Sequence, residues 1–204
     1  MRKIIPIILS IFFISSIVLG QPSKNESNLN WPCIQVLIKE LSWGSIWTGP
    51  PLDEDSSKWR NNDQLRSFSQ KLMNRKTKQE DGIEELHKYI KKNSSSKDLK
   101  LLFHALFDTT NEIWNKRTEK LLQFGKRQRK TAKEISDKLE KIKKLTDNPE
   151  SNKEELKKLE NERFWDLRRF EDRRALSDAL CEQPRFYEKR LGVYTNIILE
   201  NLDS

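Results

Sequence analysis

The feature that most constrains the fold is an unbroken helical pattern that begins near residue 97 and ends near residue 146. Mostly apolar positions recur along it at steps of three or four: Leu99, Leu102, Leu106, Thr110, Ile113, Arg117, Leu121, Phe124, Gln128, Ala132, Ile135, Leu139 and Ile142. The mean step of 43/12 is close to the 3.6 residues of an α-helical turn. Because no proline interrupts this stretch, it predicts one helix of roughly 75 Å. Gly125 is its weak point, because glycine inside a helix lowers the helix stability by about 1 kcal/mol relative to alanine.

A sharp turn is expected directly after this helix. Residues 147–150 read Asp-Asn-Pro-Glu, a composition that stops helices and favours turns. A second helical face then follows, formed by Leu156, Leu159, Leu167 and Phe170. Because the connection is short, we predict a long antiparallel helical hairpin over about 97–182, with its turn at 147–152. Arg163 and Arg174 interrupt the apolar seam, so the pair has coiled-coil character without a strict heptad repeat.

The other predicted helices are short. They are expected at residues 32–42, 62–74, about 77–93 and 184–202. Pro184 is expected to open the last of them, because proline is tolerated in the first turn of a helix. Six glycines, seven prolines and 34% charged residues favour helices over a β-sandwich or barrel. We therefore predict an all-α protein of five to six helices, organised as a single domain over 31–204.

The N-terminus has the order of regions found in a secretory signal. Arg2 and Lys3 precede an apolar run without charge, and Gly20 offers a small residue before a cleavage site. This order predicts a signal peptide at 1–20 and a flexible leader at 21–30. The alternative is an uncleaved anchor, for which the run is short, since a bilayer requires roughly 20 apolar residues. We expect an exported protein, periplasmic in a Gram-negative bacterium and secreted otherwise.

The chain contains two cysteines, Cys33 and Cys181. An even count in a chain that leaves the reducing cytosol favours one disulfide. Two free thiols and a bridge to another chain are the alternatives, and the wide separation argues against a C-x-x-C redox site. We predict an intramolecular bridge that docks the tryptophan-rich segment 31–51 onto the end of the hairpin. This segment needs an anchor because isolated helices below about 12–15 residues are marginal in water.

Short blocks along the chain carry a family resemblance. The opening reads Trp31-Pro32-Cys33-Ile34-Gln35, then Leu41-Ser42, then Trp47-Thr48-Gly49-Pro50-Pro51-Leu52. Later blocks are Lys-Arg-Gln-Arg at 126–129, Phe-Glu-Asp-Arg-Arg at 170–174 and Cys-Glu-Gln-Pro at 181–184, followed by Glu188, Arg190 and Leu191. Together they resemble a family of uncharacterised exported bacterial proteins over most of the mature chain. Segment 36–39 departs from the more basic, proline-containing stretch of that family. The resemblance implies a periplasmic address and two matching cysteine positions, and it implies no activity.

Three tryptophans near the N-terminus form the first candidate site. Trp31, Trp43 and Trp47 lie close together in the sequence, beside Gly49-Pro50-Pro51. Such a cluster is able to form a flat aromatic surface that docks a partner. The alternative is that these rings pack the segment onto the long hairpin, as large aromatic side chains usually do.

A basic stretch on the long helix is the second candidate. Lys126, Arg127, Arg129 and Lys130 surround a single glutamine, and residues 115–147 carry twelve lysines or arginines against five carboxylates. This excess is able to attract the phosphates of lipopolysaccharide, phospholipid headgroups or nucleic acid. The alternative is a solvated helix face, which the absence of interleaved aromatic residues favours.

No pattern of catalytic or metal-binding residues is found in the sequence. His87 and His104 lack a second histidine, a cysteine or a carboxylate at the spacing of zinc ligands. The chain also lacks a nucleophile elbow, a Walker loop, a dinucleotide fingerprint and a haem attachment motif. We therefore expect no catalytic residue, no metal and no cofactor, and no small-molecule substrate is indicated.

These observations favour a non-enzymatic periplasmic interaction protein, a scaffold or chaperone-like adaptor whose partner is another envelope protein. A binder of anionic surfaces, acting through the basic stretch, is the alternative. An enzyme is the third hypothesis, because helical bundles are able to host sites that a sequence does not reveal. The sequence does not indicate the oligomeric state.

Overall fold

The computed structural model describes residues 29–52, 56–148 and 150–202. The expected signal peptide at 1–20 and most of the leader at 21–30 lie outside these ranges. Within them the chain forms helices and no strand, which confirms the predicted all-α fold. In chain order the elements are η2 (Trp43–Ser45), η3 (Ser56–Asn61), α1 (Asp63–Leu72), α2 (Gln79–Lys92), α3 (Ser96–Thr146), α4 (Lys153–Ala175) and α5 (Ser177–Leu202), where η marks a 3₁₀ helix.

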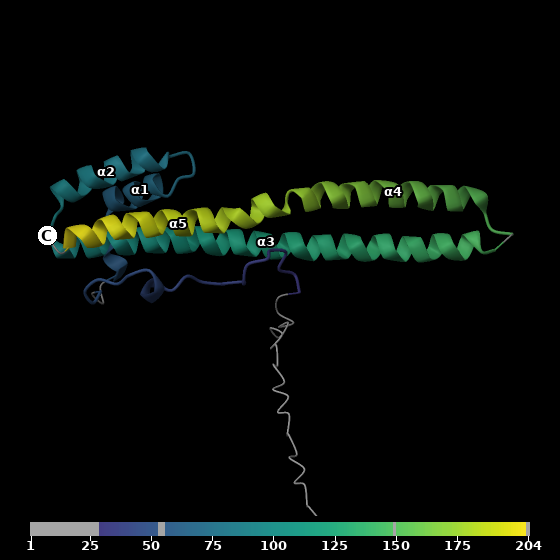
Figure 1. Cartoon of the computed structure of the whole chain (residues 1–204), viewed down its shortest axis with the longest axis horizontal. Coiled ribbons are helices and arrows are strands. Elements are labelled where there is room, and N and C mark those ends of the chain that lie inside the picture. The colour runs from purple at the N-terminus through teal and green to yellow at the C-terminus, as the bar shows by residue number, and fades with distance from the viewer. Residues whose placement is uncertain (1–28, 53–55, 149, 203–204) are drawn as a thin grey trace, which may run out of the picture.

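Helix α3 runs along the full length of the molecule, and α4 and α5 lie end to end beside it (Figure 1). It contains 51 residues, which corresponds to about 77 Å. Its start is fixed by Ser95, whose hydroxyl accepts a hydrogen bond of 3.1 Å from the backbone N–H of Asp98. Lys143 and Lys144 lie in its last turn, where positive charge favours the helix dipole. A single helix of this length makes the molecule a rod.

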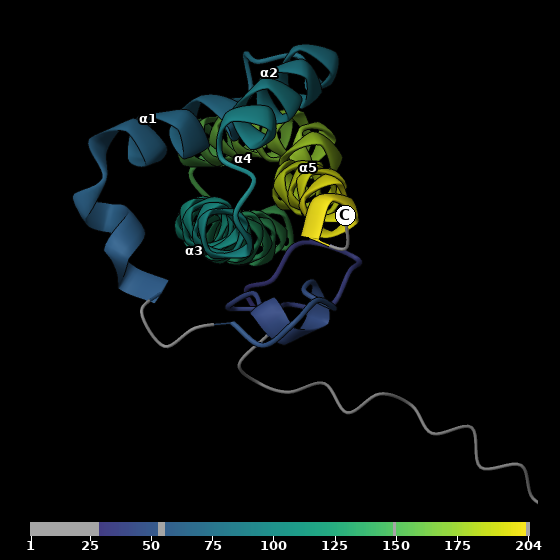
Figure 2. The same cartoon turned by 90° about the vertical axis from the view of Figure 1, so that its left-hand side faces the viewer.

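Most of the buried apolar side chains gather at one end of this rod. There α1, α2 and α5 pack with the first half of α3 (Figure 2). Core residues with no more than 1% exposure include Leu65, Leu72, Leu86, Leu99, Leu102, Leu106, Leu191, Tyr194 and Ile198. Tyr194 donates a hydrogen bond of 3.3 Å to the carbonyl of Leu72, and a Cβ at Gly82 would collide with its hydroxyl. This packed end therefore holds a closed core.

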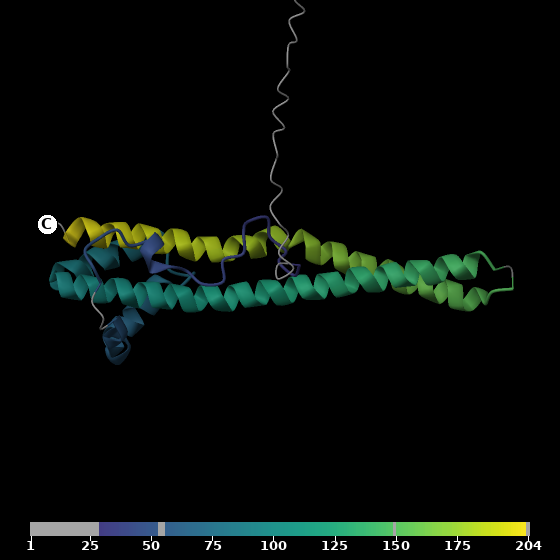
Figure 3. The same ribbon diagram turned by 90° about the horizontal axis from the view of Figure 1, so that it is seen from below.

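The other half of the rod is built differently. Here α4 lies beside the second half of α3, and no residue of α4 is fully buried (Figures 1 and 3). The side chain of Asn152 caps α4 by accepting hydrogen bonds from two backbone N–H groups. Lys138 of α3 pairs with Asp166 at 2.6 Å and with Glu162 at 3.2 Å. We call this part, residues 126–175, the distal rod; a half-buried seam and ion pairs hold it together.

The boundary between the last two helices differs from the prediction. The helix breaks at Leu176, and Pro184 lies inside α5 instead of opening it. A proline inside a helix removes a backbone hydrogen bond and costs about 3 kcal/mol. Distant contacts offset this cost: Cys181, three residues earlier, is bonded to Cys33, and its carbonyl accepts a hydrogen bond of 2.9 Å from Gln35. A local reading of the sequence does not reveal such contacts.

The helix predicted at 32–42 is also wrong. Residues 29–52, which we call the strap, are irregular or extended apart from the single turn of η2. The strap follows the side of α3 and α5 that faces away from α1 and α2 (Figures 1 and 2). Within residues 32–42 its backbone bonds to side chains of α3: the indole of Trp114 donates to the carbonyl of Ile38 at 2.8 Å, and Asn111 accepts from the N–H of Leu41 at 3.0 Å. Tertiary hydrogen bonds thus replace the expected helical ones.

Candidate interaction surface

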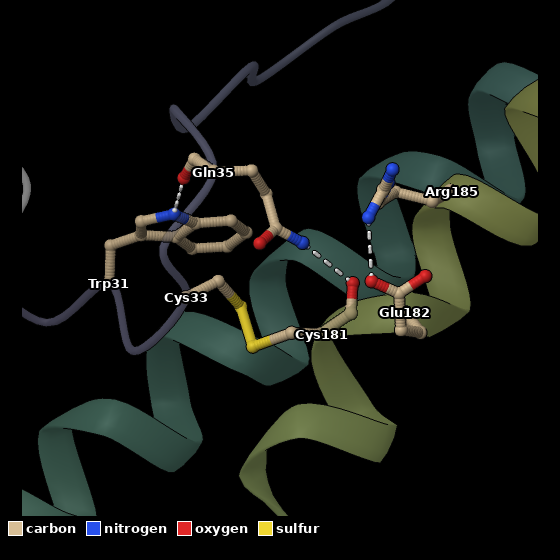
Figure 4. The surroundings of a disulfide bond; sticks show 6 residues. All are labelled: Trp31, Cys33, Gln35, Cys181, Glu182 and Arg185. Atoms are coloured by element: carbon tan, nitrogen blue, oxygen red, sulfur yellow. Dashed lines mark hydrogen bonds and ion pairs between the residues drawn. A yellow bond between two sulfur atoms is a disulfide. The ribbon is translucent and has the colours of Figure 1, made fainter.

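The disulfide between Cys33 and Cys181 is confirmed. Their Cα atoms lie 5.6 Å apart, within the range that a bridge requires. Figure 4 shows how the strap surrounds the bond: Gln35 bonds to the backbone of Cys181, and the indole of Trp31 donates to the carbonyl of Gln35 at 2.6 Å. Glu182 on α5 is paired with Arg185 at 2.7 Å. The bridge fixes the start of the strap to the first half of α5.

The strap also approaches α3 closely at Gly125. A Cβ at this position would collide with the backbone carbonyl of Asn30. Glycine therefore allows the strap to cross directly over the helix. The sequence shows this residue only as a weak point in a helix, whereas the structure shows the contact that requires it.

The three tryptophans of the strap do not gather on one surface. Trp47 is buried, with its ring centroid 4.4 Å from that of Phe103, and its indole donates to the carbonyl of Pro50 at 2.8 Å. Trp31 lies half-buried beside the disulfide. Asn30 contacts Gly125 whereas Trp47 contacts Phe103, so the strap spans about 33 Å of α3 between these contacts. Of the three side chains, that of Trp43 is the most exposed to solvent, at 51%.

The basic stretch lies on the exposed side of α3. Lys126, Arg127, Arg129 and Lys130 are all exposed. Lys130 lies 3.7 Å from Glu134, whereas the other three side chains form no ion pair with the described residues. Gln128, in the middle of the stretch, is half-buried and donates to the carbonyl of Phe170 at 3.2 Å. This bond brings the stretch beside the end of α4, where Arg173 and Arg174 are exposed.

An exposed aromatic pair on α4 is a further candidate that the sequence analysis did not identify. Phe164 is 57% exposed and Trp165 is 51% exposed, and their rings meet edge to face with centroids 5.3 Å apart. Both lie off the half-buried seam that α4 presents to α3. The sequence does contain a signal for their exposure, because positions 164 and 165 fall outside the apolar series 156, 159, 167 and 170 that forms the face of α4 towards α3.

The aromatic pair stands next to an ion-pair cluster that fixes the two helices. Asp166 accepts a hydrogen bond from Lys138 and also pairs with Arg169. The Lys138 ammonium and, secondarily, the Arg169 guanidinium lower the pKa of Asp166 against the opposing effect of desolvation. The Asp166 carboxylate in turn raises the pKa of Lys138. Lys138 and Asp166 therefore form a charged pair at neutral pH that links α3 to α4.

The described residues offer no metal centre. They contain no group of three histidines, cysteines or carboxylates placed to hold an ion. His87 is exposed, and His104 is half-buried with its ring centroid 5.9 Å from that of Phe103. Within the same ranges, none of the helices combines the length and apolarity that crossing a membrane requires.

The comparisons with known proteins returned no match: no family model, no curated protein and no solved structure resembles this chain significantly.

Proposed function

We propose that this protein is an exported, non-enzymatic interaction protein, a scaffold or chaperone-like adaptor. In this proposal α3 and α4 act as an antiparallel hairpin with coiled-coil character that projects from the packed end. The observation that carries the proposal is the exposed pair of Phe164 and Trp165. The partner is expected to be another envelope protein.

The aromatic pair lies outside the contact between α3 and α4. The α3–α4 seam is formed by other residues of α4, so both rings remain in contact with water. Exposed tryptophan and phenylalanine are unfavourable in water and are enriched in protein interfaces, where truncating a hot-spot residue costs about 2 kcal/mol or more. A partner that covers them gains this energy without rearranging the rod.

Export supports the same proposal. A disulfide that closes a loop of 148 residues is typical of an oxidising compartment outside the cytosol. The signal-like order of residues 1–20 and the resemblance to exported helical proteins point in the same direction. The partner is therefore sought in the cell envelope.

Affinity capture from envelope extracts tests this proposal. Extracts of the source cells are passed over the oxidised protein and over its F164S/W165S variant, and the bound proteins are compared by quantitative mass spectrometry. A protein retained by the first and lost from the second is the expected result, because the substitutions remove apolar surface while leaving the seam intact. Identical retention by the two columns contradicts the proposal.

A second candidate function is binding to an anionic surface. Lys126, Arg127 and Arg129 favour it, because they are exposed and form no ion pair with the described residues. Binding to vesicles that contain anionic lipid should fall steeply as salt rises and should weaken in K126Q/R127Q/R129Q. Binding that is insensitive to both changes argues against it.

A further inference from the structure

A cavity of about 700 Å³ opens at the packed end, between η3 and α1 on one side and α3 on the other. We call it the basic cleft, because its lining holds six cationic side chains and one carboxylate, Glu112. The cations are Arg60, Arg66, Arg75, Lys76, Lys116 and Arg117. They come from four separate places in the chain and are brought together by the fold alone.

The most buried lining residues, which we call the floor of the basic cleft, are mainly apolar. Trp59, Met73 and Tyr187 line it at 4%, 1% and 5% exposure. The hydroxyl of Tyr187 forms no hydrogen bond with the described part of the chain, although the residue as a whole is only 5% exposed. Tyr187 therefore offers an unused hydrogen-bonding group at a cavity wall.

Two of the arginines are held in position by neighbours. Asp108 accepts from the indole of Trp59 at 2.9 Å and pairs with Arg60 at 2.8 Å. The guanidinium of Arg60 lies 5.0 Å from the centre of the Trp59 ring. Arg117 donates to the side chain of Gln183 at 2.7 Å. Such fixed guanidinium groups lose little side-chain entropy when they bind a ligand.

The remaining charge is not neutralised. The side chains of Arg75, Lys76 and Lys116 form no ion pair or hydrogen bond with the described residues. The lining contains six cations and one carboxylate, Glu112. Two of the cations are paired with carboxylates outside the lining: Arg60 with Asp108 and Arg66 with Asp63. An excess of three positive charges therefore remains. A concave site with uncompensated positive charge attracts phosphates.

We propose that the basic cleft binds a small phosphate ester: a ligand with two phosphates joined to a planar or apolar group. The phosphates pair with Arg75, Lys76 and Lys116, while the planar or apolar group lies on the floor beside Trp59 and Tyr187. The volume fits this ligand class, because small-molecule sites measure about 300–1,000 Å³. A nucleoside diphosphate and a diphosphorylated lipid headgroup share this chemistry.

Titration calorimetry of the disulfide-intact protein tests the proposal with four probes: ADP, a soluble short-chain lipid diphosphate, inorganic pyrophosphate and adenosine. ADP or the lipid diphosphate should bind more tightly than pyrophosphate, because only they reach the floor. Adenosine should bind weakest, because it lacks the phosphates. The tighter of the first two identifies the source of the ligand.

A matched pair of variants locates the site. R75Q/K76Q/K116Q removes three unpaired cations from the cleft, and K126Q/R127Q/R129Q removes three from α3 outside it. The first should weaken binding by about tenfold or more, and the second by less than about threefold. Tyr187→Phe removes only the free hydroxyl and should weaken binding while leaving the unfolding temperature unchanged.

Three results overturn the proposal. They are equal weakening by the two triple variants, no binding of any probe at about 1 mM, and binding of ADP and of the lipid diphosphate that is no tighter than that of pyrophosphate. None of them bears on the affinity capture through Phe164 and Trp165, so the two proposals stand or fall separately.

Discussion

Arg190 of α5 donates a hydrogen bond of 2.7 Å to the backbone carbonyl of Thr77, in the connection between α1 and α2. It also donates to the carbonyls of Leu72 and Asn74, at 3.2 and 2.7 Å, and is only 3% exposed. Its guanidinium lies 4.6 Å from the centre of the Phe186 ring. A buried cation thus uses backbone carbonyls at the C-terminal end of α1, where the helix dipole favours positive charge.

Replacing Arg190 by methionine should lower the free energy of unfolding by about 3 kcal/mol, because three hydrogen bonds from a buried cation are lost. Arg185→Met is the matched control: that side chain is exposed and, among the described residues, pairs with Glu182 alone, so its replacement should cost no more than about 0.5 kcal/mol. Urea denaturation followed by circular dichroism measures both. Equal effects of the two substitutions would show that the buried contacts do not stabilise the α1–α2 connection.

Removing the disulfide should release the strap before any other part of the chain. C33S/C181S is expected to lose about 2–4 kcal/mol of stability. Hydrogen exchange should accelerate in residues 31–51 and stay unchanged around Asn148, because α3 continues for about 33 Å between Gly125, where Asn30 of the strap contacts it, and the turn. Faster exchange around Asn148 than in the strap would contradict this prediction.

Two glycines in helices should respond to alanine in opposite directions. Gly125→Ala places a Cβ against the carbonyl of Asn30 and should destabilise the protein and loosen the strap. At Gly192 nothing lies within 4 Å of the added Cβ, so alanine should stabilise α5 by up to about 1 kcal/mol. Thermal unfolding of the two variants tests this directly. A gain of stability at Gly125 would mean that the strap does not cross α3 there.

The cluster of Lys138 and Asp166 predicts a pH dependence with a definite sign. The pKa of Asp166 is lowered in the folded state. Its contribution to the free energy of unfolding is therefore complete above the pKa of the unfolded state, about 4, and is lost as the pH falls through the lower pKa of the folded state. Lys138 has a raised pKa, so its contribution is complete below about pH 10.4 and is lost as pH rises through the folded value.

Asp166→Asn should therefore flatten the acid side of the stability profile. Glu140→Gln is the control: the pKa of Glu140 is also lowered, by Lys144, but that pair is far more exposed. The control should change the acid side much less, because solvent screens exposed pairs. Denaturation midpoints measured between pH 2 and 7 distinguish the two variants. Parallel acid profiles for Asp166→Asn and the unmodified protein would contradict the assignment.

Local sequence patterns predicted the parts of the fold that depend on neighbouring residues. The helical series from Leu99 to Ile142 places α3 within one residue of its observed start, because the periodicity continues for about twelve turns. The disulfide followed from the cysteine count and the expected compartment.

The errors arose where distant residues decide the outcome. The strap is not helical because Trp114 and Asn111, about 70 residues away, take its backbone hydrogen bonds. The basic cleft could not be predicted either, since Arg60, Arg75 and Lys116 become neighbours only when η3, α1 and α3 pack together. Patterns within one helix do not contain this information.

Site-specific photocrosslinking in the source cells tests the central claim, that Phe164 and Trp165 form a partner surface. The photoreactive Trp165→benzoylphenylalanine variant is compared with the same substitution at Lys144, an exposed residue near the end of α3. The account predicts one discrete adduct from position 165 that position 144 does not give. The same adducts from both positions, or none from position 165, would contradict it.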